Sequence, residues 1–167
     1  MSHLRFLTPV AVAGLLFATA GTAVAAPPEH FGPFEQLGSG IAVCDDFDAL
    51  VVVNESTRYT LFRDEAGDVK SFKQHVSAPA NTWINLTTGK TIVVRAHFVQ
   101  TWDAKSGNLT VVGFRHLVNE QGDGVTVQDV GRIVYADQTQ EEILSMAGQH
   151  DISNWGLISP ALCDALE

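Results

Sequence analysis

The feature that most constrains this chain is a series of β-branched and aromatic runs that begins at Ile41 and continues almost to the C-terminus. Short polar turns that contain glycine, such as 64–68 and 120–124, separate the runs. Connections this short join antiparallel neighbours and leave no room for the crossover that parallel strands need. The pattern therefore predicts an all-β protein with one antiparallel, up-and-down sheet.

Eight runs in simple chain order favour a sheet that closes into an eight-stranded barrel, because closure removes the exposed edges. A β-sandwich is the alternative, although it needs longer connections between its two sheets. An eight-stranded barrel is either filled by side chains or holds one small ligand. The runs are 41–54, 58–64, 69–77, 82–87, 91–102, 109–119, 125–136 and 142–146.

The N-terminal part of the chain does not follow the strand pattern. Residues 1–25 combine Arg5, a short apolar stretch and Ala23-Val-Ala25, which is typical of a cleaved signal peptide; an uncleaved membrane anchor is the alternative. We therefore expect a secreted protein that is not membrane-bound after cleavage. Residues 26–40 are rich in proline and glycine, which predicts a flexible N-terminal arm ahead of a barrel domain and tail at 41–167.

The C-terminal tail carries a helix signal and one of the two cysteines. Ser159 can cap a helix and Pro160 suits its first position, so a short helix is expected to run on to Leu166. Cys44 and Cys163 are the only cysteines, and in an oxidising compartment such a pair indicates a disulfide. A metal site or a nucleophilic thiol is the alternative, but no Cys-x-x-Cys spacing supports a metal site.

Charge and motifs narrow the range of partners. Lys and Arg number 10 against 19 Asp and Glu, so a basic nucleic-acid surface is not expected. The sequence lacks the spacings of common metal, phosphate and serine-hydrolase motifs, and we expect neither a metal nor a cofactor. Asp45, Asp46 and Asp48 could bind Ca²⁺ loosely, although a solvated strand start is the preferred interpretation.

Two strands alternate clearly enough to assign faces. In 91–102 the even positions are mostly apolar, and in 125–136 Asp129 shares a face with apolar neighbours; 109–119 is apolar on both faces, so its register stays open. We predict that a small apolar or amphipathic ligand in the lumen would contact Ile92, Val94, Phe98, Trp102, Phe114 and Tyr135.

His116 and Asp129 are the candidates for chemistry. A turn centred near residue 121 or 122 would bring His116 diagonal to Asp129 on the neighbouring strand. There the carboxylate could orient the imidazole as a general acid or base. Alternatively, His116 is an ordinary core or rim residue and Asp129 marks a strand end or bulge.

Several short motifs together resemble a group of small secreted actinobacterial β-barrel proteins of uncharacterised function. They are Cys44 before a long β run, Asn85-Leu-Thr-Thr-Gly-Lys90, Asp129-Val-Gly-Arg-Ile-Val-Tyr135, Ala147-Gly-Gln-His-Asp151 and Leu162-Cys-Asp-Ala-Leu166. The resemblance spans about residues 41 to 166 and implies export, one disulfide and a barrel. It implies no catalytic residues, and the looser similarity to allene oxide cyclase and lipocalin-like barrels concerns architecture only.

These observations lead to three hypotheses. The first is a secreted barrel that binds a small apolar or amphipathic molecule in its lumen. The second is a cofactor-free isomerase or cyclase that uses His116 and Asp129. The third is a structural or surface-interaction protein with a filled barrel. Enzymatic activity is not the first expectation, because no catalytic motif is present.

Overall fold

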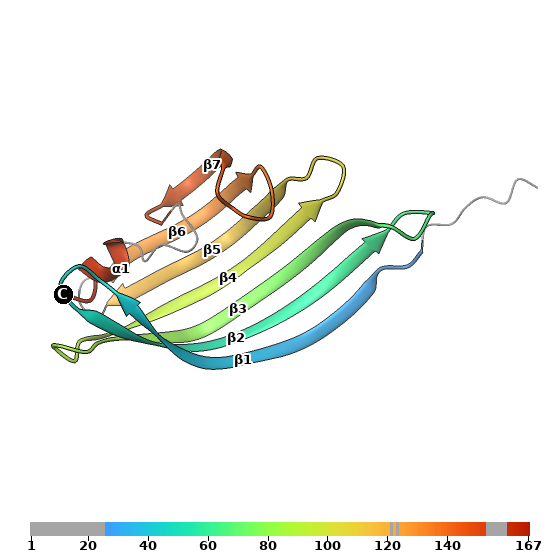
Figure 1. Ribbon diagram of the computed structural model, residues 1–167. Coiled ribbons are helices and arrows are strands. Elements are labelled where there is room, and N and C mark those ends of the chain that lie inside the picture. Colours follow the sequence, from blue (N-terminus) through green and yellow to red (C-terminus); the bar gives the residue numbers. More distant parts are fainter. Residues whose placement is uncertain (1–25, 121, 123, 153–159) are drawn as a thin grey trace, which may run out of the picture.

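The computed structural model describes residues 26–120, 122, 124–152 and 160–167, so the predicted signal peptide at 1–25 lies outside the described part. The sheet is antiparallel and its strands follow chain order, as predicted. A strongly curved sheet results, with β1 and β7 at its two edges (Figure 1). Its elements are β1 (Glu29–Val43), β2 (Asp48–Arg63), β3 (Val69–Asn85), β4 (Thr91–Asp103), β5 (Leu109–Glu120), β6 (Gly124–Tyr135), β7 (Ile143–His150) and the helix α1 (Pro160–Asp164).

The predicted eight-stranded barrel is wrong in two respects: over the described residues the sheet has seven strands, and it does not close. The first predicted run is interrupted by a turn, in which the Cys44 amide donates to the Phe47 carbonyl at 2.9 Å. The third and fourth predicted runs are one strand, β3, whose register shifts between Ala78 and Asn81. Pro79 interrupts the β pattern there, but a bulge accommodates proline within a sheet.

The predicted flexible arm at 26–40 is also corrected, because most of it forms β1. Backbone pairing with β2 runs from Glu29 to Val43. Backbone hydrogen bonds of this kind form whether or not apolar and polar side chains alternate. Pro33 lies within a register shift of this edge strand, where a missing amide hydrogen costs little. Strand β1 therefore cannot be predicted from an alternation of apolar and polar residues.

The buried side chains gather on one side of the sheet, which we call the inner face; the opposite side is the outer face. Along β4, Ile92, Val94, Ala96 and Phe98 are buried and the residues between them are more exposed, as the alternation predicted. One cluster lies at the end of the sheet that α1 covers: Ala42, Ala49, Ile92, Val94, Val118, Val127, Ile152, Leu162, Ala165 and Leu166. A second cluster lies further along the strands: Val76, Ala78, Ala96, Phe98, Leu109, Val111, Ile133 and Tyr135.

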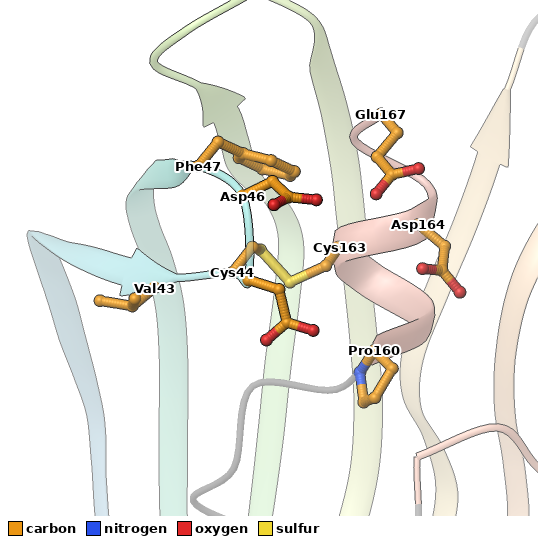
Figure 2. Close-up of a pocket in the computed structure, with 9 residues that line it drawn as sticks. Val43, Cys44, Asp46, Phe47, Pro160, Cys163, Asp164 and Glu167 are labelled. Atoms are coloured by element: carbon orange, nitrogen blue, oxygen red, sulfur yellow. A yellow bond between two sulfur atoms is a disulfide. The ribbon is translucent and has the colours of Figure 1, made fainter.

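The predicted disulfide and short C-terminal helix are confirmed, although the helix ends at Asp164 and not at Leu166. Cys163 of α1 is bonded to Cys44 in the β1–β2 turn, with their Cα atoms 5.8 Å apart (Figure 2). The helix is also fixed by the Asn85 side-chain amide, which donates to the Leu166 carbonyl at 3.1 Å. Such contacts stabilise α1, because a helix of one turn is not stable alone. The predicted cap, Ser159, lies outside the described residues.

A shallow pocket of about 110 Å³ borders the disulfide, and several carboxylates surround it (Figure 2). They include Asp45 and Asp46 of the suggested Ca²⁺ site, whereas Asp48 does not line this pocket. Within the described part of the chain, no group of His, Cys, Asp and Glu side chains has an arrangement that could hold a metal ion. None of the described helices is long and apolar enough to cross a membrane.

Candidate functional site

A bulge in β5 creates the most unusual group of side chains in the sheet. The register of β5 shifts between Phe114 and His116 against β6, and at the matching point against β4. The shift leaves Arg115 as an extra residue in the strand. Both Arg115 and His116 consequently lie on the inner face, where they line one pocket.

Asp129 of β6 is the centre of a buried polar network. Its side chain is completely shielded from solvent. One carboxylate oxygen, Oδ2, accepts from Nε of Arg115 at 2.7 Å and lies 3.5 Å from Nδ1 of His116. The other, Oδ1, lies 2.7 Å from Nδ1 of His150 in β7. A single carboxylate thus joins three adjacent strands.

Arg115 extends this network to Tyr135, at the end of β6, and to Ile152, which follows β7. Nη1 donates to the Tyr135 hydroxyl at 2.8 Å, and Nη2 donates to the Ile152 carbonyl at 2.6 Å. Its side chain is only 3% exposed. Because a buried guanidinium is tolerated only with charge and hydrogen-bond partners, these contacts explain how an arginine can lie in the core.

The network sets the charge of Asp129. Burial by itself raises the pKa of this carboxyl, but hydrogen bonds from His116 and His150 and the charge of Arg115 outweigh it, so the pKa is lowered. Asp129 is therefore a carboxylate at neutral pH. Burial raises the pKa of Tyr135, although the nearby Arg115 opposes that shift. Tyr135 therefore keeps its hydroxyl proton.

A row of glycines across β5, β6 and β7 positions the network. Gly113, Gly131 and Gly148 pair directly with one another, and all three have positive φ angles. A Cβ at Gly131 would overlap the Ala147 carbonyl oxygen of the neighbouring strand. Aligned glycines of this kind let a sheet bend sharply. Arg115, Asp129 and His150 each follow or precede one of these glycines by two residues, so the bend brings their side chains together.

His116 connects the network to a pocket of about 190 Å³ on the inner face of β2–β5. The pocket walls are largely apolar, with Val94, Phe98 and Trp83 among them. Its remaining polar side chains are Glu55 and Asn81. The Asn81 amide donates to Glu55 Oε1 at 2.9 Å, which fixes both across the pocket from the β5 bulge.

The predicted ligand-contacting residues are not all brought together. Val94 and Phe98 line the pocket, whereas Ile92 belongs to the cluster under α1, and Trp102 and Tyr135 to the second cluster. Phe114 lies on the outer face, where its ring contacts exposed His97 with the centroids 6.1 Å apart. The β5 bulge reverses the side on which the following residues lie, so Phe114 could not be assigned from alternation.

The predicted closeness of His116 and Asp129 is confirmed, although the geometry differs. They are direct cross-strand partners rather than diagonal neighbours, because the register of β5 against β6 also shifts between Val118 and Asn119, on the turn side of His116. Their role in catalysis stays a prediction.

Sequence reasoning missed Arg115 and His150 as members of the site. An arginine within a run that is apolar on both faces, opposite a strand with an aspartate on its apolar face, was the available signal for a buried ion pair. His150 was missed because the last predicted run ended at Met146, before Gly148.

The arrangement offers an apolar surface, one imidazole at its edge and a fixed carboxylate behind that imidazole. These groups can bind a small molecule and can move a proton. Comparison with known proteins adds no assignment to this geometry, since no family model, no curated protein and no solved structure matches the chain.

Proposed function

We propose that the inner face binds a small, mostly apolar molecule with one uncharged polar end. The apolar part would lie against Val94, Phe98 and Trp83, and the polar end would face His116. The pocket of about 190 Å³ is smaller than the roughly 300–1,000 Å³ typical for drug-sized ligands. The ligand is therefore small, or part of it extends out of the open side of the sheet.

The observation that carries this proposal is the position of His116. It lines the pocket, its side chain is 23% exposed, and its Nδ1 is directed at buried Asp129. A histidine held in this way offers a fixed hydrogen-bonding group at the edge of an apolar surface. The carboxylates of Asp129 and Glu55 offset the charge of Arg115, which favours a carbonyl or hydroxyl over an anionic group.

A location outside the cytoplasm is part of the proposal. The Cys44–Cys163 disulfide is typical of an oxidising compartment, and residues 1–25 match a cleaved signal peptide. The resemblance to small secreted actinobacterial proteins favours the same location.

A cofactor-free isomerase is the second candidate, and the His116–Asp129 pair favours it. Asp129 would orient the imidazole, which would take a proton from a carbon next to a ligand carbonyl and return it to another atom of the same molecule. The net reaction would move one proton and need no other reactant.

Binding can be tested with small ketones and alcohols such as 2-heptanone and cyclohexanol. Because Trp83 lines the pocket, a saturable change in tryptophan fluorescence is expected, and it should disappear in a Trp83→Phe variant. His116→Gln should weaken binding by about tenfold, the effect of one hydrogen bond of roughly 1.4 kcal/mol. His97→Gln is the matched control, because His97 lies on the outer face, and it should leave binding unchanged.

Two outcomes would decide against the proposal. Absence of saturable binding across the panel would favour a structural or surface-interaction role. Equal weakening by His116→Gln and His97→Gln would show that the inner pocket is not the site. Deuterium incorporation next to the ketone carbonyl in D₂O, lost in His116→Gln, would identify the isomerase instead of a simple binder.

A further inference from the structure

A second hollow, of about 690 Å³, lies over β1–β4 and is separate from the pocket at His116. Its polar lining includes Arg58, His75, His97, Ser56 and Ser77. The side chains of Arg58, His75 and His97 are all exposed to solvent. We call this hollow the outer groove, because these side chains belong to the outer face.

The sheet register shows why these side chains share one face. Arg58 pairs with His75 across β2 and β3, and Ser56 pairs with Ser77 one row away. Ser77 in turn pairs with His97 of β4. Directly opposed residues of antiparallel strands lie on the same side of the sheet, so the five side chains form a compact group. Val76 and Phe98, which alternate with them, are buried on the inner face.

Strand β1 forms the rim of the outer groove. Its register against β2 shifts between Phe31 and Phe34, and residues 31–33 border the groove at that point. His30, just before the shift, is held by a contact of 3.1 Å between its Nδ1 and the Thr60 hydroxyl. The rim therefore adds a third imidazole to the lining.

The charge of the outer groove is opposite to that of the chain. Acidic residues outnumber basic ones by 19 to 10, yet among the described residues that line the groove none is acidic and one is an arginine. The nearest carboxylate in the pairing scheme is Glu35, which pairs with Ser56 but does not line the groove. A guanidinium, three imidazoles and several hydroxyls supply hydrogen-bond donors in this space.

We propose that the outer groove binds an oxyanion group, a phosphate, sulfate or carboxylate, carried by a small molecule. Arg58 is the charged anchor, since guanidinium binds such groups through two parallel hydrogen bonds. His75, His97 and the hydroxyls of Ser56 and Ser77 complete the contacts. This site is independent of the ligand proposed for the inner face.

The test uses the full-length, disulfide-bonded protein and three probes: inorganic phosphate, sulfate and acetate, each balanced with chloride to constant ionic strength. Amide NMR shifts that saturate in β2 and β3 are expected for at least one probe. The probe that saturates at the lowest concentration identifies which oxyanion the groove prefers.

Matched variants separate a site from general charge attraction. Arg58→Gln should weaken binding by about tenfold, as expected for loss of a charged hydrogen bond. Arg132→Gln removes the same charge from the same face, in the same cross-strand row but on β6, and should have no effect. Both arginines are exposed, so neither change should disturb folding; the thermal midpoints of the variants verify this.

The proposal is overturned if the shifts rise linearly without saturation for all three probes. It is also overturned if Arg132→Gln weakens binding as much as Arg58→Gln, because the attraction would then be diffuse. Loss of binding in His116→Gln but not in Arg58→Gln would place the anion on the inner face and contradict the proposal.

Discussion

Strands β1 and β4 belong to the same sheet and are both long, but they differ in what covers them. Along β4, buried and exposed residues alternate, and Phe98 is only 4% exposed. Along β1, almost every side chain is exposed, and Leu37 reaches 76%. Strand β4 lies in the middle of the sheet and contributes to both apolar clusters. Strand β1 contributes only Ala42 to them and, within the described part of the chain, pairs with β2 alone. Alternation in a sequence therefore reports a covered face, not the presence of a strand.

Removal of a carboxylate is expected to give the largest difference in unfolding free energy between a covered and an uncovered strand. Asp129→Asn removes the carboxylate that compensates buried Arg115, and should lower the free energy of unfolding by about 3–5 kcal/mol. Glu35→Gln, on exposed β1, is the matched control and should stay within about 0.5 kcal/mol of the parent. Urea denaturation measures both. Similar small losses would mean that the Asp129 network contributes little to stability.

Truncation of a leucine should likewise destabilise a covered strand much more than an uncovered one. Leu109 is 1% exposed in the second apolar cluster, so Leu109→Ala should cost about 2–5 kcal/mol. Leu37→Ala on β1 should change stability by less than about 0.5 kcal/mol. A large loss for Leu37→Ala in urea denaturation would show that β1 is covered in solution, for example by another chain.

Glycine-to-alanine substitutions compare the backbone of a covered strand with that of β1. Gly131 has a φ of 146°, and a Cβ there would overlap the next strand, so Gly131→Ala should cost about 1–3 kcal/mol or more. Gly38 of β1 has open space around it, and Gly38→Ala should be neutral or stabilise by up to about 1 kcal/mol. The thermal midpoints of the two variants measure both effects; equal midpoints would show that the backbone at Gly131 accommodates a side chain as easily as at Gly38.

The smallest expected effect is a pH dependence. The pKa of Asp129 is lower in the folded protein than in the unfolded chain, where an ordinary aspartate has a pKa of about 3.9. Its contribution to stability is therefore fully present above about pH 4 and is lost as the pH falls through the lower, folded pKa. The thermal midpoint of the parent should fall more steeply below pH 4 than that of Asp129→Asn. Parallel curves would contradict the assigned pKa direction.

The same contrast explains what the sequence could predict. The all-β class, the chain-order topology, the disulfide and the apolar face of β4 followed from turn spacing, two cysteines and alternation. The strand count and closure did not, because the edge strand β1 has no alternating pattern and Pro79 lies inside a strand. At the site, the approach of His116 to Asp129 could be predicted from the sequence. The roles of Arg115 and His150 could not, because they depend on a bulge and a glycine row that leave no sign in the alternation of apolar and polar residues.

The bond between Cys44 and Cys163 has a consequence for how this molecule responds to damage. The two residues are 119 positions apart, and strands β2 to β7 lie between them. A protease that cuts once within any of the intervening turns would leave two pieces still covalently joined. Such a nicked molecule would run as one species until a reductant separated it, so a single cleavage need not release either half of the sheet.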